Sequence, residues 1–148
     1  MTELRKTNHL VRIYYYKDNF YIVGAVEMPP IFVWREVNPV YKVERDKEKL
    51  IEAIGTARSQ SISRFHLGHD NPEIKPWNGE KIWNSASKSW SIWWNEDGRV
   101  EISSDEPYDP QEPDLEKGKA WRRIKDGKKL LPSPISFQDI AKEILNNL

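Results

Sequence analysis

Short runs of β-branched and aromatic residues open the chain, and they favour strands over helices. Residues 10–16 (LVRIYYY) and 20–26 (FYIVGAV) are two such runs, separated by three polar residues. These side chains pack well on a pleated sheet, and two runs joined by a short polar turn are typical of a hairpin. Pro29 and Pro30 end the second run, because proline cannot donate to a strand ladder. The sequence therefore predicts a sheet that begins with an antiparallel hairpin.

The same residue types recur along the chain and predict further strands, at residues 31–37, 40–43, 81–83, 89–94 and 99–103. Asp97 and Gly98 favour a tight hairpin turn between the last two. Residues 59–79 are polar and turn-rich, so we expect a long connection there, with a short strand or turn at 63–66. Three prolines among acidic residues predict an exposed loop over 106–119, after which residues 120–124 return to the fold.

Two segments change to helical spacing. Asp46 is a candidate N-cap for a helix over residues 47–60, whose apolar face is Leu50, Ile51, Ile54 and Ala57. Ser136 and Asp139 stand at capping positions of a final helix that ends the chain. No internal repeat is evident. We expect a single α+β domain over residues 1–148, in which an antiparallel, aromatic-rich sheet is packed by two main helices forming a single layer on one face.

Composition limits the environment and the chemistry of this 148-residue chain. It contains no cysteine, which excludes disulfides and thiolate metal sites. The N-terminus lacks the apolar run of a signal peptide, and no segment approaches the length of a membrane span. We therefore expect a cytoplasmic protein without a membrane partner. The formal net charge is zero, which argues against a general polyanion binder.

No group of residues makes a convincing catalytic or metal centre. His66 and His69, beside Asp70, are three residues apart in a polar segment, whereas zinc needs three or four converging ligands. The chain has no thiol, no nucleophile elbow and no glycine-rich phosphate loop. Carboxylates such as Glu101 and Asp105 lie in acidic company that favours a solvated loop. We expect no enzyme, no metal and no cofactor; a small enzyme that uses His66 is the minor alternative.

Tryptophan and a separation of charge are the features that favour binding. Strand alternation places Trp90, Ile92 and Trp94 on one face and Trp93 on the other, so Trp93, like Trp77 and Trp83, is a candidate contact residue as well as a candidate core residue. Residues 101–116 carry seven acids and no base. The predicted partner-binding residues are Trp93 and the acids of this block, Asp105, Glu106, Asp109, Glu112, Asp114 and Glu116.

A second interpretation uses the opposite charge. Residues 117–129 carry seven bases and one acid, Asp126. Combined with tryptophan stacking, this basic segment would suit a nucleic-acid or other ligand-binding module. The zero net charge and the acidic block just before it argue against nucleic acid, so this stays the alternative.

Three short motifs also carry a family resemblance. Residues 50–54 (LIEAI) lead to Ala57-Arg58-Ser59, a Ser63-Arg64 pair follows, and the last helix opens with Ser136 and Asp139. In this order the chain resembles the small bacterial immunity proteins of contact-dependent growth inhibition systems. The resemblance implies a cytoplasmic protein that binds and blocks a cognate toxin domain, often a basic nuclease, and that has no catalytic residues of its own.

Overall fold

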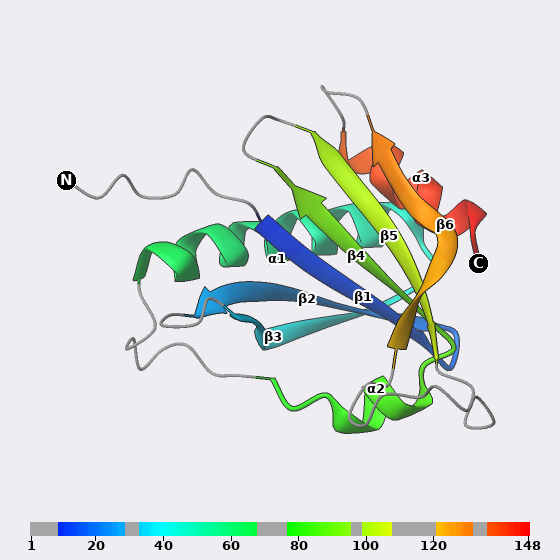
Figure 1. Cartoon of the computed structure of the whole chain (residues 1–148), viewed down its shortest axis with the longest axis horizontal. Helices are drawn as coiled ribbons and strands as arrows, with labels where there is room; N and C mark the ends of the chain where they lie inside the picture. The colour runs from blue at the N-terminus through cyan, green and yellow to red at the C-terminus, as the bar shows by residue number, and fades with distance from the viewer. Residues whose placement is uncertain (1–8, 29–32, 68–76, 96–98, 108–120, 132–135) are drawn as a thin grey trace.

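The computed structural model describes residues 9–28, 33–67, 77–95, 99–107, 121–131 and 136–148. Figure 1 shows the elements within these ranges, which follow one another as β1 (His9–Tyr16), β2 (Asn19–Met28), β3 (Val33–Glu44), α1 (Lys47–Leu67), α2 (Glu80–Ser85), β4 (Lys88–Trp94), β5 (Val100–Pro107), β6 (Trp121–Leu131) and α3 (Phe137–Asn146). The predicted α+β class is confirmed.

All six strands join one antiparallel sheet in the order β3-β2-β1-β4-β5-β6. The predicted β1–β2 hairpin is confirmed. Its turn holds Lys17 and Asp18 at positive φ, 48° and 63°, a backbone geometry that suits the right-handed twist of a two-residue hairpin. β4 and β5 also pair as neighbours, as predicted, although Asp97 and Gly98 lie outside the described residues.

The sheet buries one face against α1 and α3. Alternate residues of the strands, including Val11, Ile13, Ile92 and Ile102, form a core with apolar residues of both helices and are at most 2% exposed. Gly24 lets α1 approach closely, because a Cβ atom there would lie only 2.6 Å from the carbonyl oxygen of Ala57. The single layer formed by the two main helices is therefore confirmed.

Helix α2 lies against the opposite face of the sheet. Its Ile82, together with Ala86 just beyond its end, packs with Tyr14 and Val23 in a second, smaller cluster. The sequence predicted a strand over residues 81–83, and that prediction is wrong. Ile82 and Ala86 are four residues apart and meet the same cluster, which is helical rather than strand spacing.

Three further boundaries differ from the prediction. Residues 33–37 and 40–43 belong to one strand, β3, which lies at the edge of the sheet. Pro39 is tolerated there because no strand on the outer side needs the hydrogen bond that a proline cannot donate. α1 continues to Leu67, so the expected strand or turn at 63–66 is wrong; residues 59–67 contain neither glycine nor proline. Glu106 and Pro107 belong to β5 rather than to a loop, and residues 108–119 lie outside the described ranges.

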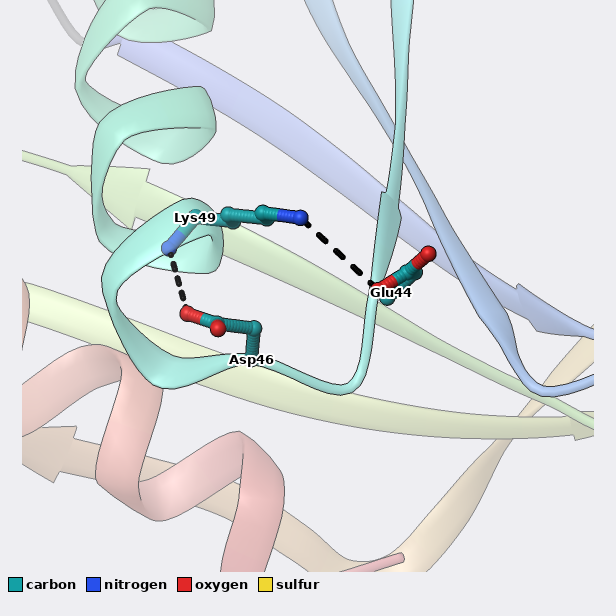
Figure 2. Close-up of polar contacts among 3 residues, drawn as sticks. All are labelled: Glu44, Asp46 and Lys49. Atoms are coloured by element: carbon teal, nitrogen blue, oxygen red, sulfur yellow. Dashed lines mark hydrogen bonds and ion pairs between the residues drawn. The ribbon is translucent and has the colours of Figure 1, made fainter.

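Both predicted helix caps are present. The Asp46 side chain accepts a hydrogen bond from the backbone N–H of Lys49 at 3.0 Å, and the Lys49 ammonium lies 3.7 Å from the Glu44 carboxylate (Figure 2). That ion pair is exposed and adds little stability. At α3, Ser136 and Asp139 form a reciprocal capping box.

The strand order contains a repeat that the sequence does not reveal. β1, β2 and β3 form a meander followed by α1, and β4, β5 and β6 form a second meander followed by α3. The two meanders meet at the antiparallel β1–β4 pair, and α2 lies between them in the chain. The described fold is thus two βββα units placed edge to edge.

Candidate partner-binding surface

Trp93 lies on the sheet face that α1 and α3 leave uncovered. Its register partners are Leu10 on β1 and Glu101 on β5, and its side chain is half-buried. Trp90 and Trp94, by contrast, are 2% and 9% exposed in the helix-covered core. The predicted alternation of the three tryptophans is confirmed, and Trp93 is the one on the face away from α1 and α3.

Asp105 and Glu106 lie near the end of β5, where it pairs with β6. In register, Asp105 is opposite Arg123 and Glu106 is opposite Arg122. Asp105 and Glu106 therefore lie within the β5–β6 ladder and not in the connection that follows it.

The other four predicted acids, Asp109, Glu112, Asp114 and Glu116, lie outside the described residues. Chain order places them in the connection from the end of β5 to the start of β6. Trp93 is in register with Glu101, near the start of β5, and Glu106 is five positions further along that strand. At about 3.3 Å per residue, Glu106 is therefore about 17 Å from the level of Trp93 along β5. The sheet does not gather all the predicted contact residues at one point.

Five bases of the basic segment fall within the edge strand β6. In register, Arg123 and Lys128 are opposite Asp105 and Ser103, whereas Arg122 and Lys129 are opposite Glu106 and Ile102. Lys117 and Lys119 lie outside the described residues.

Trp77, just before α2, and Trp83, within α2, pack with Tyr14. The Trp77 ring lies 5.9 Å from that of Tyr14 and 5.6 Å from that of Trp83, which it meets edge-on. The Trp77 backbone N–H donates to the carbonyl oxygen of Glu36 at 2.9 Å. Both tryptophans are half-buried in this cluster, which is a structural role more than a contact role.

A buried polar pair lies under the same helix, and the sequence did not indicate it. The Tyr14 hydroxyl donates to a carboxylate oxygen of Glu36 at 2.5 Å, and the two residues are only 4% and 7% exposed. Burial raises the pKa of Glu36, while the nearby Arg12 charge and the hydrogen bond from Tyr14 lower it in part. Burial, and then the charge of Glu36, raise the pKa of Tyr14.

The pair resembles an acid–base pair in composition, but its position favours a structural role. Trp83 brings a buried indole N–H close enough to lower the pKa of Glu36, although that N–H has no acceptor at good hydrogen-bond geometry among the described residues. Aromatic rings thus close over the carboxylate. Alternation in β1 and β3 could have placed Tyr14 and Glu36 on one face, but only the tertiary fold brings them together.

The described residues include no group of three histidine, cysteine, aspartate or glutamate side chains placed to hold a metal ion. His66 belongs to α1, and His69 and Asp70 lie outside the described ranges. No helix in the described ranges combines the length and apolar character needed to cross a membrane.

Comparison with known proteins identifies the fold and no function. No protein-family model matches the chain, and no curated protein sequence matches it either. Among solved structures, the chain is similar to a protein of unknown function, NMB0488 from Neisseria meningitidis, with a TM-score of 0.59. The match covers 96% of this chain and 94% of that one at 13% sequence identity. Such a likeness shows a shared α+β fold and nothing further.

Proposed function

We propose that this chain is a cytoplasmic immunity protein that binds a cognate toxin domain and neutralises it by covering the toxin's active site. The proposed toxin is a nuclease. The acids of the β5–β6 connection carry the proposal. In chain order, Asp109, Glu112, Asp114 and Glu116 follow β5 and precede β6, two strands that pair with each other. Clustered carboxylates imitate the phosphate charge that a nuclease site attracts.

Trp93 extends the proposed contact across the uncovered sheet face. A protein–protein interface of ordinary size buries about 800 Å² on each partner, enough to reach from the β5–β6 connection to Trp93. Tryptophan is enriched among residues that contribute most to binding. The proposed contact therefore joins a charged part, which speeds association, to an aromatic part, which slows dissociation.

Co-purification with the product of the gene directly upstream tests this function. The expected result is a stable complex and protection of cells that express that product. No complex together with no protection would refute the proposal. A salt-dependent mobility shift with single-stranded RNA or DNA, in place of toxin binding, would support the nucleic-acid alternative instead.

Charge variants then locate the contact. Neutralising the connection acids should lower the association rate constant about tenfold or more at low salt, because electrostatic steering is lost. The variant carries D109N, E112Q, D114N and E116Q, and the control removes the same charge from exposed acids elsewhere with D18N, E44Q, E48Q and E52Q. Equal effects in the two variants would show that net charge, and not this connection, governs binding.

A further inference from the structure

Residues 77–87, which include α2 and are called the α2 cover, lie against the sheet face opposite α1 and α3. Two backbone hydrogen bonds tie the ends of the cover to the sheet. The Trp77 N–H donates to the carbonyl oxygen of Glu36 on β3, and the Ser87 N–H donates to that of Tyr15 on β1, both at 2.9 Å. Between these ties, apolar side chains of α2, such as Ile82, pack on the sheet. The middle of the cover is therefore held by side-chain packing.

The Glu36 carboxyl group lies under this cover, beside the Tyr14 hydroxyl that donates to it at 2.5 Å. The Trp77 ring lies 5.9 Å from the Tyr14 ring, and the Trp83 ring meets the Trp77 ring edge-on at 5.6 Å. Glu36 as a whole is 7% exposed. The cover thus contributes aromatic rings to the surroundings of an acid that water hardly reaches.

Each element packed against Glu36 contributes a different group. From β1 come the charge of Arg12 and the hydroxyl of Tyr14, and from the cover comes the neutral indole N–H of Trp83; all three favour the ionised carboxylate. Its register partner on β2 is Ala25, which is apolar. Burial outweighs these groups and raises the pKa of Glu36. A buried carboxylate that ionises gains most from renewed contact with water.

We propose that the α2 cover is a pH-controlled device, closed over protonated Glu36 and lifted from the sheet in its middle when Glu36 releases its proton to the solvent. Lifting lets water reach the carboxylate and uncovers the apolar surface of Tyr14 and Val23. The closed form is fully favoured below the ordinary pKa of a glutamate and loses stability as pH rises through the raised pKa of the closed form. This inference does not depend on the proposed toxin.

Native-state amide hydrogen exchange of the full chain tests the device. The reporters are the backbone N–H groups of Trp83 and Ala86, which donate to the carbonyl oxygens of Gly79 and Ile82 at 2.7 and 2.8 Å. Exchange rates corrected for the intrinsic effect of pH give the equilibrium constant of opening. This constant should rise by up to about tenfold per pH unit above about pH 4, the ordinary pKa of a glutamate, and then level off. An opening constant that does not change with pH overturns the proposal.

Urea separates local lifting from global unfolding. The α2 amides should exchange faster than the amide of Ile54, a fully buried residue of α1, and low urea concentrations should hardly affect them, because local opening exposes little surface. An equal urea dependence at both places would overturn the proposal.

Two matched variants identify the acid that controls the cover. Glu36→Gln, which cannot ionise, should abolish the rise with pH. Glu101→Gln, the same change on the same sheet face in β5, should retain it. A rise that persists in Glu36→Gln, or that disappears in Glu101→Gln, would show that Glu36 does not control the cover. The wild-type pH profile and its urea dependence decide the question even if Glu36→Gln is poorly folded.

Discussion

Tyr14→Phe removes one oxygen atom from the buried pair beneath α2. The lost interaction is a 2.5 Å hydrogen bond to Glu36, between side chains that are 4% and 7% exposed. A hydrogen bond to a charged group contributes about 1.5–3 kcal/mol, and the carboxylate is left behind in the interior. We therefore expect the free energy of unfolding to fall by about 2 kcal/mol at neutral pH. For a chain of this size that corresponds to a melting temperature lower by about 4–8 °C.

Urea unfolding followed by circular dichroism measures this change, and the same chemistry at a second tyrosine provides the control. The Tyr15 hydroxyl donates to Asp18 at 3.1 Å in an exposed hairpin turn. Tyr15→Phe should therefore alter stability by no more than about 0.5 kcal/mol. A double-mutant cycle with Glu36→Gln should give a coupling energy of about 1–2 kcal/mol. A coupling energy near zero, or equal effects of the two Tyr→Phe changes, would refute the reasoning.

Three other substitutions test separate features of the fold by the same unfolding measurement. Gly24→Ala should lower the free energy of unfolding by about 1–3 kcal/mol, because the new Cβ atom would clash with the α1 backbone. An unchanged urea midpoint would mean that α1 shifts freely to make room for it. Ser136→Ala should lower the free energy of unfolding by about 1 kcal/mol, because the N-cap of α3 is lost. A smaller decrease would show that the cap is redundant. The folded-state pKa of Glu36 is raised, so its contribution is complete at low pH and is lost as pH rises through that pKa. Glu36→Gln, which does not titrate, should therefore gain stability relative to wild type as pH rises above about 4, the pKa of an unfolded glutamate, and a constant difference would contradict this.

Local patterns predicted most of the elements, because their causes are local. The hairpin of β1 and β2, the caps at Asp46 and Ser136 and the alternation around Trp93 each depend on residues a few positions apart. The element boundaries that were predicted wrongly depend on residues that are close in space but distant in the sequence. β3 passes through Pro39 because the strand is at an edge, and residues 81–83 are helical because Ile82 meets the Tyr14 cluster.

The candidate site was predictable only in part, for the same reason. Sequence alone placed the acids in one block, but only the register shows that Arg122 and Arg123 face two of them. Tyr14 and Glu36 likewise meet across strands that are not adjacent in the sheet.

The two βββα units have a consequence for how the chain can be divided. Each unit keeps its own strand pairings, and the contact between their strands is the β1–β4 ladder. A break within residues 68–76, between α1 and α2, would cut none of the described strands and helices. Two separately expressed fragments would each expose one long unpaired strand that matches the other, which is the requirement for reassembly by fragment complementation. The same exposed strands would let two intact copies exchange halves, so dimers that form on refolding at high concentration should be domain-swapped at β1 and β4.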